Sequence, residues 1–107
     1  MHTVVCPLTG DTNAERALAS AYDAACILKA RIELCSVVED RHMVGRREEY
    51  LDRIGAKSRA SGASMPGVHV VVDPHAPRAL AARAASPDVQ MVMATSAQPL
   101  MHTGYLG

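Results

Sequence analysis

The chain has 107 residues, of which 49% are hydrophobic and 21% charged, a balance that predicts one globular domain over residues 1–107 and excludes a disordered chain. Eleven basic and eleven acidic side chains give a formal net charge of zero, so no overall field favours nucleic acid or an anionic membrane surface. Tyrosine is the only aromatic residue type, and no apolar run approaches the roughly 18 residues that span a bilayer. We therefore expect neither a nucleic-acid partner nor a membrane partner.

The N-terminal residues lack the basic segment and the long apolar stretch of a signal peptide, so we expect a cytoplasmic protein. The cysteines Cys6, Cys26 and Cys35 agree with this location, because their number is odd and their spacing matches no disulfide or zinc framework. We expect them to be buried, reduced thiols. The five histidines show no ligand spacing, and we predict no metal site.

The first apolar run, residues 3–8, predicts a buried strand, and Gly10 then permits a sharp turn of the backbone. A helix is expected over residues 12–28. Thr12 and Glu15 have the spacing of a capping box, and apolar residues then recur at helical intervals. The many alanines of this segment predict a helix that approaches a sheet closely.

The second predicted strand covers residues 32–38, and the charged segment 39–59 follows it. This segment predicts a surface helix with a thin apolar stripe toward the sheet, made of Met43, Tyr50, Leu51 and Ile54. Acidic residues are mixed among its basic ones, so a solvated helix face is favoured over a nucleic-acid patch. The basic residues are Arg41, Arg46, Arg47, Arg53, Lys57 and Arg59.

A Ser/Gly/Pro-containing loop over residues 58–67 leads to the third predicted strand, residues 68–72. The Asp-Pro-His sequence at 73–75 predicts a strand-to-helix turn rather than an acid–base pair. The third helix begins near Pro77, since proline is tolerated in a first turn, and it ends near residue 86. Residues 89–93 predict the fourth strand.

Strands that alternate with helices predict an α/β fold, in which a doubly wound parallel sheet lies between two layers of helices. The near-continuous apolar runs indicate strands buried on both faces. Ligands of such sheets bind beyond the carboxyl ends of the strands, where the strand order reverses, here between the first and fourth strands. We therefore expect the loops after Leu8 and Met93 to line one crevice.

Small residues follow the fourth predicted strand with the spacing of a phosphate-binding loop. Ala94, Ala97 and Gly107 form a small-x2-small-x9-Gly pattern, and Thr95 and Ser96 add hydroxyl groups to it. The chain has neither the Gly-Lys-Ser/Thr of a Walker loop nor the Gly-x-Gly-x-x-Gly dinucleotide fingerprint. No Ser, His and Asp stand in the motif order of a hydrolase, so we predict no catalytic residues.

Taken together, these motifs resemble the universal stress protein family over nearly the whole chain. Val-Cys-Pro-Leu-Thr-Gly-Asp at 5–11 and Ala-Glu-Arg-Ala-Leu at 14–18 resemble the family's first strand and helix. Val-Met-Ala-Thr at 92–95 resembles its Val-Met-Gly-Thr, and residues 32–38 and 73–80 resemble its second strand and third helix. The resemblance implies a three-layer α/β/α fold with strand order 3-2-1-4.

The resemblance also implies an adenine nucleotide, with adenine and ribose near the first and second strands and phosphates on the closing loop. The corresponding residues are Pro7, Leu8, Thr9, Val38, Met93, Ala94, Thr95, Ala97 and Gly107. Thr9 stands where an acidic residue is typical, and Ala94 and Ala97 replace glycines of the ATP-binding branch. Pro99 removes one N–H donor from the same loop.

The function implied is that of a non-catalytic stress-response or regulatory protein, a homodimer that holds ATP or another adenine nucleotide between the first and fourth strands. A dimerisation module without a nucleotide is the alternative that the alanines favour. A small enzyme of a related nucleotide-binding superfamily is a further alternative, although neither a Ser-Gly-Gly pyrophosphatase loop nor a His-x-Gly-His motif is present.

The family continues with a helix and a fifth strand that pairs beside the fourth, whereas the printed sequence ends at Gly107. A truncated chain, a further tail or a partner chain on the bare fourth strand would each account for this difference. We expect a missing tail, because an uncovered apolar edge strand invites pairing.

Overall fold

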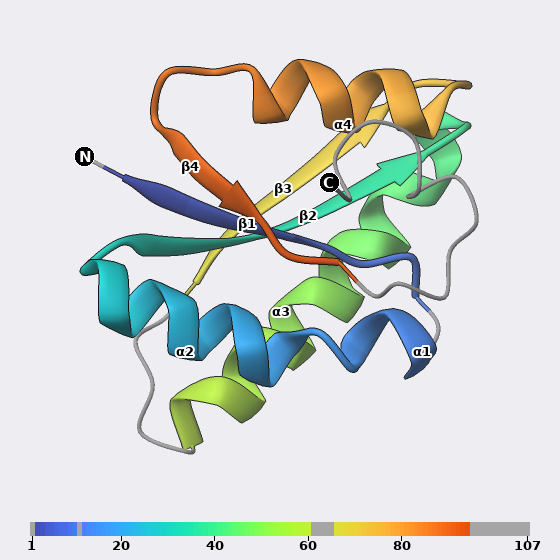
Figure 1. Ribbon diagram of the computed structural model, residues 1–107. Coiled ribbons are helices and arrows are strands. Elements are labelled where there is room, and N and C mark those ends of the chain that lie inside the picture. Colours follow the sequence, from blue (N-terminus) through green and yellow to red (C-terminus); the bar gives the residue numbers. More distant parts are fainter. Residues whose placement is uncertain (1, 11, 61–65, 95–107) are drawn as a thin grey trace.

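The computed structural model describes residues 2–10, 12–60 and 66–94 (Figure 1). The strands are β1 (Thr3–Pro7), β2 (Arg31–Val38), β3 (Gly67–Val72) and β4 (Val89–Val92). The helices are α1 (Thr12–Glu15), α2 (Leu18–Leu28), the 3-10 helix η1 (Arg41–Met43), α3 (Val44–Ala60) and α4 (Ala76–Ala84). None of the helices in these ranges combines the length and the apolar character needed to cross a membrane.

The four strands form one parallel sheet in the order β3-β2-β1-β4. β1 is therefore central, with Val4 opposite Ile32 of β2 and Val5 opposite Val92 of β4. The strand order reverses between β1 and β4, as the sequence predicts. Figure 1 shows α1, α2 and α3 on one face of the sheet and α4 on the other, which confirms the three-layer α/β/α arrangement.

The main core lies between the sheet and the layer formed by α1, α2 and α3. Alternate residues of β1 point into it, and Ile32 and Leu34 extend it along β2. Residues 14–25, in α1 and α2 and between them, contribute small side chains to this core: Ala14, Ala17, Ala21 and Ala25. The helix α3 contributes the larger side chains of Leu51 and Ile54. Because the side chain of an alanine is short, α2 can lie close to the central strand, as its composition predicts.

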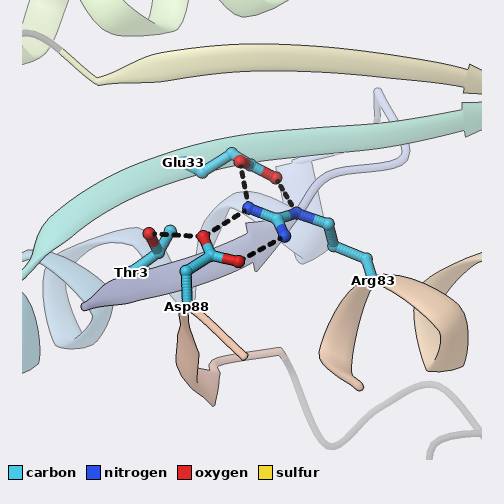
Figure 2. A network of polar contacts seen from close by, with 4 residues as sticks. All are labelled: Thr3, Glu33, Arg83 and Asp88. Atoms are coloured by element: carbon cyan, nitrogen blue, oxygen red, sulfur yellow. Dashed lines mark hydrogen bonds and ion pairs between the residues drawn. The ribbon is translucent and has the colours of Figure 1, made fainter. Parts of the chain in front are cut away.

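On the opposite face, a network of polar side chains joins α4 to β1, to β2 and to Asp88, the residue before β4 (Figure 2). The Arg83 guanidinium donates two hydrogen bonds to Glu33 of β2, at 2.8 and 2.9 Å, and two to Asp88, both at 3.1 Å. Thr3 of β1 donates its hydroxyl to the Asp88 carboxylate at 3.0 Å. These bonds lower the pKa of Asp88 to about 2, with the Arg83 hydrogen bond as the largest cause. The network fixes α4 and the start of β4 against β1 and β2.

The single helix predicted over residues 12–28 is in fact two helices. The Arg16 and Ala17 N–H groups bond to carbonyls three residues back, at 3.2 and 3.5 Å, so the turn tightens there. Regular bonding resumes where the Ala21 N–H donates to the Ala17 carbonyl at 2.9 Å. Glu15, at the end of α1, accepts a hydrogen bond from the Tyr50 hydroxyl of α3 at 2.5 Å. The break therefore coincides with a tertiary contact that helical periodicity does not reveal.

Burial on both faces, predicted for all four strands, holds for β1 and is wrong for β3 and β4. Every residue of β1 is buried, whereas Val68, Val72 and Met91 are among the exposed large hydrophobic residues. β3 and β4 are the outer strands of the described sheet, so each has a neighbour on one side only. The apolar composition of a strand does not distinguish a central position from an outer one.

Two further predictions from sequence are corrected on the helices. Cys26 is exposed rather than buried, because α2 directs Ala21 and Ala25 to the sheet and Cys26 is rotated away from that face. Met43 is exposed, since it belongs to η1 and not to the apolar stripe of α3. Leu51 and Ile54 of that stripe are buried as predicted.

Candidate functional site

The loop after β1 turns sharply and is fastened to β2. Gly10 has φ = +97°, a conformation that L side chains rarely adopt, so glycine suits this position. Leu8 donates its N–H to the Cys35 carbonyl at 2.8 Å, and its own carbonyl accepts the Ser36 hydroxyl at 2.6 Å. The loop therefore leaves the sheet from a fixed point, and Thr9 and Gly10 are exposed beyond it.

The carboxyl end of β4 lies beside that of β1. The Met93 N–H donates to the Val5 carbonyl at 2.8 Å, which continues the pairing past the end of β4. Met93 and Ala94 are half-buried. The loop after β1 and the residues after β4 thus leave the sheet at the same edge, as the topology predicts.

The predicted site residues differ in how much of their side chains solvent can reach. Leu8 and Val38 are 1% and 2% exposed, and Pro7 is buried too, so these three residues support the edge from within the protein. Thr9, Met93 and Ala94 are more accessible. The remaining predicted residues, Thr95, Ala97 and Gly107, lie outside the described residues.

Arg47, in the first turns of α3, reaches the base of the loop after β1. Its Nη1 donates to the Ser36 hydroxyl at 2.6 Å, and a Cβ atom added to Gly10 would lie 3.6 Å from the Arg47 Cζ atom. Ser36 is 1% exposed and donates its own hydrogen to Leu8, so its lone pairs are left to accept from Arg47. The positively charged guanidinium group of Arg47 is therefore held against the turn at Gly10.

Sequence reasoning assigned Arg47 to a solvated helix face, and this assignment is wrong. The local mixture of basic and acidic residues gives no sign that one of the five arginines turns inward. The signal that could have identified the inward position of Arg47 is Ser36. Ser36 is a polar residue two positions after Leu34, so it lies on the same buried face of β2. A buried hydroxyl needs partners, and Leu8 and Arg47 supply them.

The turns after β2 and β3 are closed by aspartates. Asp73 accepts the His75 N–H at 2.8 Å and Arg78 at 2.9 Å, which lowers the pKa of its carboxyl group. Asp40 likewise accepts the His42 N–H at 2.9 Å, with the His42 ring 2.7 Å away, and these contacts lower its pKa. Residues 73–75 therefore form the predicted strand-to-helix turn.

Within the described ranges, no group of three or more His, Cys, Asp and Glu side chains is placed to hold a metal ion. Burial raises the pKa of the Cys6 thiol to about 12 and that of Cys35 to about 11. Both therefore stay protonated at neutral pH and are poor metal ligands or nucleophiles.

No protein-family model matches the sequence, and no curated protein matches it either. A solved structure does match the fold: the crystal structure of a universal stress protein in complex with cAMP. The two chains are 20% identical with a TM-score of 0.60, and the match covers 78% of this chain. It covers 63% of the other chain, so this chain spans less than two thirds of that protein. The four parallel strands in the order 3-2-1-4 are thus shared with that protein, and the chain has the fold of a universal stress protein.

Proposed function

We propose that this chain is a non-catalytic regulatory protein of the stress response, which binds an adenine nucleotide at the carboxyl ends of β1 and β4. The observation that carries the proposal is the meeting of these two strand ends at the point where strand order reverses. There the Met93 N–H bonds to Val5, while Thr9 and Gly10 are exposed on the adjoining loop. Open parallel sheets bind their ligands at such points.

The fold of the similar protein supports the same ligand class, since its structure is a complex with cAMP. Cyclic AMP and ATP share adenine and ribose and differ in phosphate charge. We propose that Thr9 donates or accepts a hydrogen bond at the ribose, where a neutral hydroxyl binds more weakly than a carboxylate. The residues from Ala94 onward are proposed to approach the phosphates.

Isothermal titration calorimetry with ATP, AMP, cAMP and adenosine tests the proposal. We expect saturable binding of at least one adenine ligand, weakened in Thr9→Ala and unchanged in Ser20→Ala. Ser20 is a matched control because it is an exposed hydroxyl-bearing residue of α2 that is not among the predicted site residues. Absence of heat with all four ligands at millimolar concentration would contradict nucleotide binding.

We propose that the protein does not hydrolyse ATP and that it is located in the cytoplasm. A steady-state ATP hydrolysis assay is expected to give no more than trace phosphate, and sustained hydrolysis would favour the alternative of a small enzyme. Cell fractionation is expected to recover the protein with the cytoplasmic fraction, and recovery with membranes would contradict the location.

A homodimer is the second part of the proposal, and the exposed side of β4 favours it. β4 is an outer strand of the described sheet, and Met91 on it is 37% exposed. Outer strands offer unpaired N–H and C=O groups to another chain. Sedimentation velocity is expected to show a dimer without added nucleotide. A monomer over the whole micromolar range would refute pairing through this edge.

A further inference from the structure

A cationic pocket lies at the start of α3, where Arg47 also reaches Gly10 of the loop after β1. It has a volume of about 280 Å³ and is lined by His42, Met43, Arg46 and Arg47. The first two residues come from η1, directly after β2, and the two arginines come from the first turns of α3. This volume is slightly below the roughly 300–1,000 Å³ of sites for drug-sized ligands, so a small ligand fits it better.

Among the described residues, the lining of the pocket contains two arginines and no carboxylate. Within the described part of the chain, neither Arg46 nor Arg47 forms an ion pair with an aspartate or glutamate. Asp40, which precedes η1, contacts the His42 ring and accepts the His42 N–H. Two arginines without an ion-pair partner among the described residues therefore line a small concave space.

The guanidinium of Arg47 is also held in place before any ligand arrives. One of its N–H groups bonds to the buried Ser36 hydroxyl at 2.6 Å, and its Cζ atom lies against Gly10. An arginine carries five N–H donors in a planar fork, so several donors remain for an anion. Because the side chain is already ordered, binding loses less conformational entropy than it would with a mobile arginine.

We propose that this pocket binds a phosphate-class anion, with Arg47 as the anchored donor and Arg46 as the second cation. Planar guanidinium groups match the oxygens of a phosphoryl group in geometry as well as in charge. The described lining of the pocket comes from η1 and α3, and anion binding there does not require that a nucleotide be bound. Its ligand is either a free inorganic phosphate compound or the phosphate of a nucleotide whose base occupies the proposed crevice.

Titration of the intact protein with inorganic pyrophosphate at low ionic strength tests the pocket directly. We expect saturable binding to the wild type and a loss of about tenfold or more in Arg47→Met, the size expected for a charge-assisted hydrogen bond. Arg46→Met is expected to weaken binding as well. Arg53→Met is the matched control, since Arg53 is an exposed arginine of the same helix that does not line the pocket.

Two outcomes would overturn the proposal. One is absence of pyrophosphate binding by the wild type. The other is equal weakening in Arg47→Met and Arg53→Met, which would show a diffuse effect of net charge. Circular dichroism checks that each variant is folded. If Arg47→Met is not folded, the comparison of Arg46→Met with Arg53→Met decides, because both side chains are exposed.

The two sources of phosphate are separated by titrating ATP and adenosine into the same variants. Binding of ATP that pyrophosphate competes with and that Arg47→Met weakens identifies the nucleotide as the source. Binding of pyrophosphate without any binding of ATP identifies a free phosphate compound, and the pocket then stands while the proposed nucleotide function fails. Binding of ATP that is equal in all variants, with no binding of pyrophosphate, refutes the pocket and leaves the nucleotide function intact.

Discussion

Replacing Arg83 by methionine tests how strongly the polar network fixes α4 to the sheet. Methionine keeps most of the apolar length of the side chain and removes its charge and its donors. Four hydrogen bonds disappear, two to Glu33 and two to Asp88. The two carboxylates differ in access to water: the Glu33 side chain is 14% exposed and that of Asp88 is 44% exposed.

This difference in exposure sets the expected size of the effect. Asp88 can recover hydration and still accepts the Thr3 hydroxyl, whereas Glu33 is left almost enclosed without its cation. A charged group deprived of its hydrogen-bond partners costs about 1.5–3 kcal/mol when it stays largely desolvated. We therefore expect Arg83→Met to lower the free energy of unfolding by about 2–3 kcal/mol, or Tm by roughly 10 °C.

Urea denaturation followed by circular dichroism measures the effect, and two double-mutant cycles divide it between the carboxylates. Arg83→Met combined with Glu33→Gln should recover most of the loss, because the enclosed charge is then absent. The coupling of Arg83 with Asp88, measured with Asp88→Asn, should be the smaller of the two. A larger coupling for Asp88 than for Glu33 would refute the argument from exposure.

The same network predicts a dependence of stability on acid. The pKa of Asp88 is about 2 in the folded protein, below the ordinary value of an aspartate, so its contribution is complete above the unfolded pKa. As pH falls from about 4 toward 2, that contribution is lost. Asp88→Asn should reduce the loss of stability over this window, measured by urea denaturation at each pH. An unchanged slope would show that other carboxyl groups dominate.

Three further predictions concern single residues. Leu51→Ala should lower the free energy of unfolding by about 2–5 kcal/mol in urea denaturation, since Leu51 is 0% exposed in the core; a loss below about 1 kcal/mol would contradict its burial. Gly10→Ala should cost about 1–3 kcal/mol because of the positive φ, whereas Gly45→Ala in α3, with open space around it, should not destabilise; equal effects would show that φ is not the cause. A thiol reagent should label Cys26 in the folded protein and label the two buried cysteines only after unfolding, and mass spectrometry showing three labels under native conditions would refute this.

The fold could be predicted from sequence because its strongest signals are local. Each strand is a short apolar run between polar segments, and the alternation with helices leaves few topologies. The errors arose where tertiary contacts decide the outcome. α1 ends at Glu15, where the Glu15 carboxylate accepts the Tyr50 hydroxyl, and the outer strands of the described sheet keep apolar residues exposed. Neither effect changes the composition of the segment concerned.

The candidate site was predictable only as far as the topology determines it. That the loops after β1 and β4 meet follows from strand order alone. Strand order does not determine which side chains are accessible at that edge. Leu8 and Val38, for example, are buried in the protein. Arg47 was assigned to solvent, since the partner that draws it inward, Ser36, is eleven residues away in sequence. A contact between two secondary-structure elements, such as that between Arg47 and Ser36, leaves no periodic pattern in the amino-acid sequence.

The bond between Thr3 and Asp88 joins residues that are 85 positions apart in the sequence. It reflects the central place of β1, whose two neighbours in the sheet are β2 and β4. During synthesis, β1 is therefore made before β4, and its pairing in the described sheet is complete only after β4 has been made. Contacts of such long sequence separation slow folding. We expect α2 and α3 to form with β1, β2 and β3 first, and the sheet to close only when β4 is available.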